Sequence, residues 1–183
     1  SVFHDGFSME AAESVLDLSE WPECPWSLDV VGSLLDKSLL YSRDVRGQAR
    51  LGMYVSIQEY AAEKLDQNRA DTRLRHARYF TKFGSEAYVQ SMHVHGGIQR
   101  SQVQMLELEN LMAGVESAME SGEMGVTALC ATGAANVLLL RGPTTQGLEL
   151  MDRILRRSVQ PRERSQLLRL AGQFLQHAGR WSE

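Results

Sequence analysis

Few residues of this 183-residue chain have the types and spacing that chemistry requires. His93 and His95 are one residue apart and could bind a metal ion, but no third ligand is evident and two glycines follow, so a solvated loop is favoured. Cys24 and Cys130 lie far apart and outside any CxxC pair, which is typical of free thiols in a reducing compartment. We therefore predict no metal site.

A second candidate group is acidic. Glu149 and Asp152 lie three residues apart on one predicted helical face, where paired carboxylates could act as general acid and base. Arg153 and Arg156 follow them by four residues each, so surface ion pairs are the simpler explanation. Nothing in the sequence brings a Ser/His/Asp or Cys/His set together, and we expect this chain not to be an enzyme.

Charge is distributed unevenly along the chain, whose net charge is −4. Residues 1–70 carry six Lys or Arg and twelve Asp or Glu, a net charge of −6, whereas residues 71–183 carry thirteen and eleven, a net charge of +2. Neither part has the basic excess of a nucleic-acid-binding protein. One basic cluster forms either a solvated face or a docking site for an acidic partner, and it consists of Arg156, Arg157, Arg162, Arg164 and Arg169.

Hydrophobic content of 43% and charged content of 23% are ordinary for a globular protein. The longest strictly apolar run, 137–140, is far shorter than the ~20 residues that cross a bilayer. We predict no contact with a membrane and a cytoplasmic location.

The first third of the chain has the pattern of a winged helix. Ser8 can cap a short helix, and Ser27 can cap a second helix that carries an apolar stripe. A strand runs out through Tyr41, and residues 48–54 have the pattern of a returning strand. With a further helix over 55–68, the order helix, helix, hairpin, helix indicates a winged-helix domain without its first helix.

Beyond residue 68 we predict helices alone. Asp71 can cap the first of them, Gly142-Pro143 is a stop and restart, and Pro161 opens the last. Helices of about 14–20 residues joined by short turns favour an α-solenoid over a closed bundle. The intervening helices are predicted over 99–120, 126–140 and 144–157.

The last helix resembles helix A of a tetratricopeptide repeat. Four of its residues match the large-small-small-large packing series of that repeat: Leu168, Ala171, Gly172 and Leu175. Gly179 and Trp181 match the turn and the start of helix B, and Gly142 precedes Gly179 by 37 positions, near the ~34-residue period. A stacked repeat cannot bury its apolar face alone, so we expect the chain to be an internal piece of a larger protein.

A winged helix suggests DNA binding, but the charges argue against it. The helix that would enter the groove carries Asp29 and Asp36 against Lys37, and has no Arg, Asn or Gln to reach base edges. In the wing, three arginines could touch the phosphate backbone: Arg43, Arg46 and Arg50. We do not expect this segment to bind DNA directly.

Several stretches in order resemble the winged-helix subdomain and helical connector of STAND-class ATPases, the NB-ARC group that includes large bacterial regulators. The stretches are 1–12, 34–40, 57–65, 75–80 and 107–111. The resemblance implies a mostly α fold, with an N-terminally truncated winged-helix domain over 1–69 that holds one small β-hairpin. It implies for 70–183 a connector and a C-terminally truncated α-superhelix of tetratricopeptide-like repeats.

In that class the winged helix contributes a Met-His-Asp motif whose His contacts bound ADP. The motif aligns here with Met53-Tyr54-Val55, so Tyr54 replaces the His and could still donate a hydrogen bond to a phosphate oxygen, whereas Val55 cannot accept one. The alternative is that Tyr54 packs at the end of a strand. No GxxxxGK[ST] motif occurs, so the resemblance implies no cofactor in this chain, and ATP or ADP bound by the parent protein.

The resemblance implies a non-catalytic regulatory segment of a signal-transduction ATPase. Its partners would be an upstream nucleotide-binding domain and an unidentified protein or small-molecule inducer on the repeats. Two alternatives stay open, namely a transcription regulator that binds DNA through this winged helix, and a plain helical-repeat scaffold for protein–protein interaction.

Overall fold

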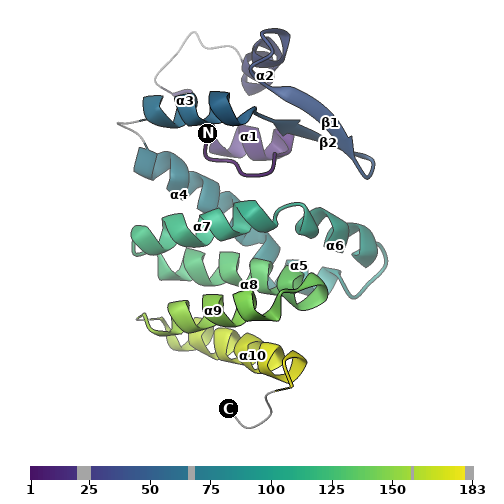
Figure 1. The fold of residues 1–183 in the computed structure, drawn as a ribbon, viewed down its shortest axis with the longest axis vertical. Helices are drawn as coiled ribbons and strands as arrows, with labels where there is room; N and C mark the ends of the chain where they lie inside the picture. Colours follow the sequence, from purple (N-terminus) through teal and green to yellow (C-terminus); the bar gives the residue numbers. More distant parts are fainter. Residues whose placement is uncertain (20–25, 66–68, 158, 180–183) are drawn as a thin grey trace.

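The computed structural model describes residues 1–19, 26–65, 69–157 and 159–179. These residues are mostly helical and include one two-stranded antiparallel sheet, as predicted (Figure 1). In chain order the elements are α1 Met9–Val15, α2 Ser27–Asp36, β1 Tyr41–Val45, β2 Gln48–Gly52, α3 Val55–Lys64, α4 Arg69–Phe80, the 3₁₀ turn η1 Thr81–Gly84, α5 Glu86–Ser91, α6 Gly97–Met105, α7 Leu108–Glu120, α8 Met124–Arg141, α9 Thr144–Leu155 and α10 Pro161–His177.

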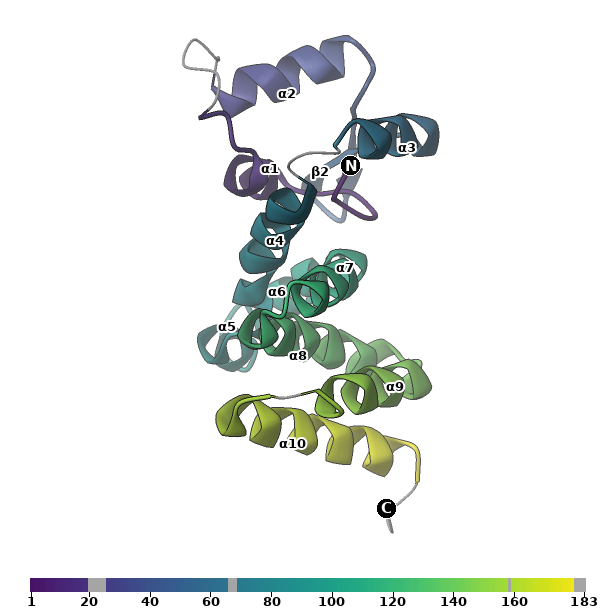
Figure 2. The same cartoon turned by 90° about the vertical axis from the view of Figure 1, so that its left-hand side faces the viewer.

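The elements form an elongated stack. Residues 1–65, which we call the N-terminal unit, lie at one end, and the helices of residues 69–179, which we call the helical array, follow layer by layer (Figures 1 and 2). In the array α4 packs on α7, α7 on α8, α8 on α9, and α9 on α10. The predicted succession of helices after a winged-helix-like unit is therefore confirmed.

The N-terminal unit forms where the sequence predicts it. The Ser8 hydroxyl accepts a hydrogen bond from the Ala11 amide at 3.1 Å and so caps α1. Strands β1 and β2 pair from Tyr41–Gly52 to Val45–Gln48, and a turn with positive φ at both Arg46 and Gly47 joins them.

A short strand-like contact joins the start of the chain to this hairpin. Phe7 and Leu51 exchange two backbone hydrogen bonds of 2.9 and 2.8 Å. The order of this bridge, two helices and the hairpin is winged-helix-like.

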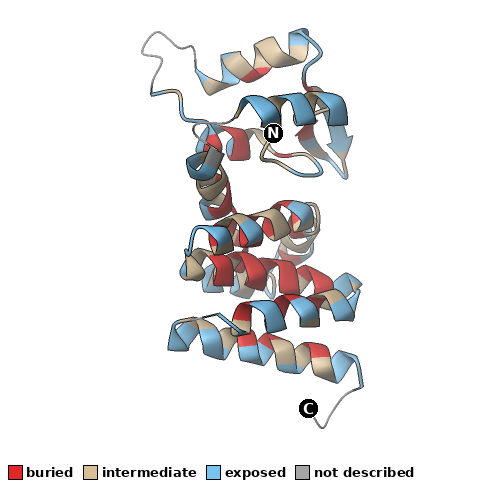
Figure 3. Cartoon of the chain, turned by 60° about the vertical axis from the view of Figure 1, so that its left-hand side comes forward, coloured by how far each residue is buried: buried red, intermediate tan, exposed pale blue. Residues whose placement is uncertain are grey.

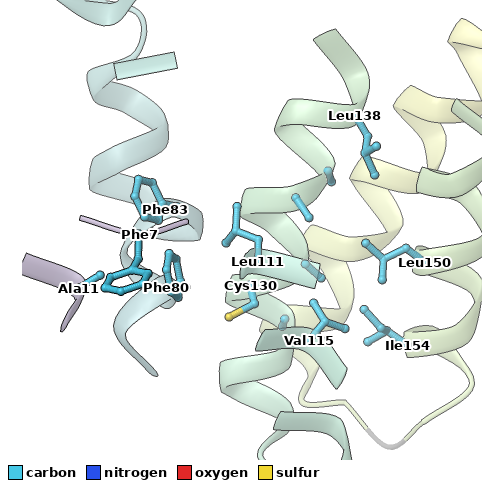
Figure 4. Packing of buried hydrophobic residues seen from close by; sticks show 14 of the residues in the cluster. Phe7, Ala11, Phe80, Phe83, Leu111, Val115, Cys130, Leu138, Leu150 and Ile154 are labelled. Atoms are coloured by element: carbon cyan, nitrogen blue, oxygen red, sulfur yellow. The ribbon is translucent and has the colours of Figure 1, made fainter. Parts of the chain in front are cut away.

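The array holds most of the fully buried side chains, which Figure 3 shows concentrated in its middle layers. Burying each large apolar side chain stabilises the fold by roughly 1.5–3 kcal/mol. The largest apolar ones are Phe80, Leu111, Leu138, Met151, Ile154, Leu167, Leu170 and Phe174. Figure 4 shows Phe7 and Ala11 packed beside Phe80 and Phe83, so the core continues from the N-terminal unit into the array.

The predicted helices differ from the observed ones at several boundaries, and two differences matter here. The single helix expected over 99–120 is two helices, because the chain turns at Leu106 and Glu107 between α6 and α7. Apolar periodicity continues through this corner and therefore hides it. Asp71 lies in the first turn of α4 rather than at its cap, since that helix begins at Arg69.

The packing face of α10 was predicted wrongly by one position. The structure buries Leu167, Leu170 and Phe174, whereas Leu168 of the predicted series is 51% exposed and a Cβ on Gly172 would meet no atom within 4 Å. A helix satisfies apolar spacing on either of two adjacent faces, and the neighbouring α9 selects one of them. Trp181 lies outside the described residues.

Helix α8 is long and apolar enough to cross a membrane by length and composition. However, 56% of it is buried against other helices, as expected for the central helix of a core. Among the described residues this is the one helix that meets those criteria.

Candidate functional site

A buried polar seam joins the N-terminal unit to the helical array. It consists of the Arg50 and Glu107 side chains, the Asn110 amide, and the carbonyl groups of Gly6 and Leu106. Arg50 points inward from β2 and is 2% exposed, while Glu107 stands at the N-cap position of α7 and is 3% exposed. The guanidinium pairs with both carboxylate oxygens of Glu107, and one of these contacts measures 3.2 Å.

Arg50 also donates to two backbone carbonyl groups. Its Nη2 donates to the Gly6 carbonyl at 2.7 Å and to the Leu106 carbonyl at 3.2 Å. Arg50 was predicted as a wing residue available to a DNA backbone, and that prediction is wrong because the side chain is consumed by this seam. A carboxylate of opposite charge and hydrogen bonds to carbonyl groups make a buried arginine tolerable.

Asn110 extends the seam toward the first residues of the chain. Its Nδ2 donates to the Gly6 carbonyl at 2.9 Å and to Glu107 Oε2 at 2.8 Å, and its Oδ1 accepts from the His4 amide at 2.8 Å. Gly6 permits this approach because its φ is +85° and a Cβ there would lie 2.8 Å from the Leu51 carbonyl. The segment before α1 is thus held to α7 by one amide.

His76 lies behind Asn110 in an aromatic setting. Its Nε2 is 3.2 Å from Asn110 Oδ1, and its ring lies 4.7 Å from Phe80 and 5.3 Å from Phe3, centroid to centroid. Burial lowers the pKa of His76 from 6.5 to about 4, although the hydrogen bond to Asn110 works in the opposite direction. The imidazole is therefore neutral near pH 7 and donates from Nε2.

A cavity of about 520 Å³ opens beside the seam. Residues of α3, α4, α7 and the first residues of the chain line it, so a molecule in it would contact both the N-terminal unit and the array. Its rim carries Glu59, Glu116 and Glu120 together with Arg73, which lies 3.5 Å from Glu120. The volume falls within the range of small-molecule sites, but the rim is polar and exposed.

The outer face of the N-terminal unit is apolar and acidic. In α2, Leu28 is 57% exposed, and Trp26 next to it is 82% exposed. Asp29 and Asp36 of the same helix are exposed as well. Helix α3 contains no buried residue among those described, and its Val55 and Tyr60 are mostly exposed.

Tyr54, the predicted nucleotide contact, lies at the N-cap position of α3 and is 56% exposed. Its ring is 5.1 Å from that of Tyr41 across the start of the hairpin. The phenol thus faces outward beside another tyrosine rather than packing into the core. A contact with a nucleotide phosphate remains a prediction.

Among the described residues, the other predicted groups do not come together. His93 and His95 lie in the exposed turn between α5 and α6, and the described residues contain no cluster that could hold a metal ion. Cys130 is buried, its thiol donates to the Ala77 carbonyl at 3.3 Å, and burial raises its pKa to about 12, which keeps it unreactive. Cys24 lies outside the described residues.

The acidic pair on α9 makes surface ion pairs, as expected, but one partner differs. Asp152 pairs with Arg156 at 2.6 Å, whereas Arg153 reaches across to Glu116 on α7 instead of pairing with Glu149. In the basic cluster, Arg162 lies 3.7 Å from Glu86 and Arg164 donates to the Leu155 carbonyl at 3.1 Å. The cluster is a solvent-exposed face with local partners.

Sequence reasoning missed Glu107, Asn110 and His76 as members of one group. Glu107 alone is 57 positions from Arg50, and Asn110 is farther still, so no local spacing links them. One signal was available. Arg50 lies in a predicted strand directly before Leu51 and Gly52, both of which are buried, and a charged residue within a buried stretch needs a buried partner of opposite charge.

The chain is similar to part of mycobacterial proteins described as transcriptional regulators. The chain is 28% identical over 156 residues to "Putative HTH-type transcriptional regulator Rv0890c" of Mycobacterium tuberculosis, and equally to the protein of the same description, Mb0914c, of Mycobacterium bovis. The match covers 84% of this chain and 17% of each relative. No family model matches the chain. No solved structure gives a significant match.

Proposed function

We propose that this chain is a regulatory, protein-contacting segment of a larger bacterial HTH-type transcription regulator, and that it does not itself read DNA. The description of the mycobacterial relatives supports the regulator class, and the match to 17% of their length supports a part of such a protein. The segment would link a signal sensed on the helical array to a neighbouring module through the N-terminal unit.

The outer face of α2 carries this proposal. A helix that enters a DNA groove needs cationic or amide side chains toward bases and phosphates. Helix α2 instead exposes Leu28, Asp29 and Asp36, with Trp26 beside it. Exposed aromatic and aliphatic side chains next to carboxylates favour binding to a protein over binding to a polyanion such as DNA.

The neighbouring module is proposed to be a nucleotide-binding domain of the STAND class. The exposed Tyr54, Val55 and Tyr60 of α3 would face it together with α2. In this arrangement Tyr54 would stand close to the nucleotide phosphates and Val55 would pack at the same contact. The nucleotide and its catalytic residues would belong to that module and not to this chain.

A second candidate function is direct DNA binding by the N-terminal unit. It is favoured by the name of the relatives and by two hairpin arginines that remain at the surface, Arg43 and Arg46. Arg43 is already paired with Asp5 at 3.0 Å, and Arg50 is buried in the seam. The hairpin therefore offers DNA less positive charge than its sequence suggests.

A titration of this chain against a mixed-sequence DNA duplex tests the two candidates. Fluorescence anisotropy at about 50 mM and about 200 mM salt would reveal the steep salt dependence that phosphate contacts cause. We expect no salt-dependent binding. The matched control is the double variant Asp29→Lys/Asp36→Lys, which makes α2 basic and should gain weak, salt-sensitive binding. Micromolar, salt-sensitive binding by the unaltered chain would instead establish the second candidate.

A further inference from the structure

The N-terminal unit contacts the helical array at two places of different chemistry. At the first, α1 packs on α4, and Ala11 lies near Phe80 (Figure 4). At the second, the polar seam joins β2 and the residues before α1 to the start of α7. Elements β2 and α3 have no extensive backbone packing against α7, so side chains make this second contact.

These two contacts respond differently to separation. Exposing an apolar contact to water costs free energy in proportion to its area. Opening a seam of charged and amide groups returns each group to water, which hydrates it, so the net free energy of opening is modest. Removing one charge while the seam stays closed is a different case, because the remaining charge is buried without a partner.

The seam is also tied to the centre of the array. Arg50 donates to the Leu106 carbonyl at the corner between α6 and α7. Two residues earlier, the buried Gln104 amide donates to the Phe83 carbonyl at 3.0 Å and to the Gly133 carbonyl at 3.1 Å. Gly133 lies in the middle of α8. A shift of α8 against α6 would therefore displace the turn between α6 and α7 to which Arg50 is hydrogen-bonded.

We propose that Arg50 and Glu107 form a latch between the N-terminal unit and the helical array. The latch opens locally: the Phe7–Leu51 bridge breaks, and β1, β2 and α3 swing away from α7 while α1 stays on α4 and the array stays folded. This inference rests on the proposed coupling function and names the contact through which coupling would pass.

Hydrogen exchange of this chain tests the latch, with the Phe7 and Leu51 amides as reporters of the seam and amides of α8 as the internal reference. In Glu107→Leu and in Arg50→Met we expect exchange at Phe7 and Leu51 to rise roughly 10²- to 10⁴-fold, the range implied by loss of one partner of a buried ion pair. Exchange in α8 should stay unchanged. The double variant should exchange no faster than either single variant, because its second substitution removes the charge left unpaired by the first.

The matched control is Arg43→Met on the same hairpin. Arg43 also pairs with a carboxylate, Asp5, but both side chains are largely exposed, so its loss should leave exchange within a factor of about two. Equal acceleration in the hairpin and α8 would mean global unfolding and would overturn the latch. So would multiplication of the two single effects in the double variant, or no effect of either. None of these outcomes depends on DNA binding, so the latch and the proposed function can fail separately.

Discussion

The N-terminal unit and the helical array differ in how they bury their side chains. In the array, Leu111, Met151, Ile154 and Phe174 have no exposed surface, and α8 is covered by several helices. In the N-terminal unit, α3 has no buried residue among those described, and in α2 the one buried residue is Val31. The array supplies its own core, whereas the unit depends on α4 and α7 for much of its burial.

The helical array therefore provides most of the stability, whereas the N-terminal unit contains the elements that can change position. A self-contained core opens only with global unfolding, but the hairpin and α3, which meet the array through a polar seam, can move while α1 stays on α4. The exposed apolar side chains of α3, Val55 and Tyr60, would then contact different surroundings in the two positions.

Replacing Leu111 with Asp should unfold the array and release the N-terminal unit with it. Leu111 is fully buried, so the variant loses its packing and places a carboxylate without a partner in the core, at a cost of more than about 5 kcal/mol. Urea unfolding followed by circular dichroism measures the change. The same substitution at Leu168, which is 51% exposed, serves as the control and should cost less than about 1 kcal/mol. A stable Leu111→Asp protein would contradict the self-contained core.

Acid should weaken the junction of the two regions through His76. Above pH 6.5 the ring is neutral in both the folded and the unfolded chain and adds no pH dependence. Between pH 6.5 and about pH 4 the unfolded chain binds a proton that the folded chain does not, so stability falls as pH falls, by about 3 kcal/mol in total. Urea midpoints across this range measure the slope.

The variant His76→Gln keeps an amide donor toward Asn110 but cannot titrate. It should flatten most of the slope between pH 6.5 and 4, leaving a smaller contribution from His4, whose pKa burial also lowers. An unchanged slope in His76→Gln would show that other groups control the acid response of the junction.

Replacing Gly147 with Ala should destabilise the outer layers of the array. A Cβ at this position would lie 2.2 Å from the Phe174 ring, so α9 and α10 must shift apart at a cost of about 1–3 kcal/mol. Gly172→Ala in α10 is the matched control, because its Cβ would meet no atom and the change should stabilise the helix by roughly 0.5–1 kcal/mol. Thermal unfolding measures both. Equal effects would show that α9 and α10 are packed loosely, which would contradict a tightly packed core in the array.

Local signals predicted the order of elements well. Ser8 caps α1, Gly142-Pro143 separates α8 from α9, and Pro161 opens α10, because each acts on the backbone within a few residues. The same local reasoning predicted α6 and α7 as one helix. The turn between them contains Glu107, whose charge partner Arg50 is 57 residues away in the sequence. Local reasoning also assigned Arg50 to the surface of the wing, where residue type alone would place it.

The sequence by itself determined the helix-rich class, the hairpin, and the acidic character of α2, because these follow from periodicity, turn chemistry and charge along a short stretch of chain. Only the tertiary structure decided which face of α10 is buried, that Arg50 turns inward, and that Gly6, Glu107 and Asn110 meet. The physical reason is that burial and charge pairing depend on which distant groups come within a few ångströms, and no local pattern encodes that distance.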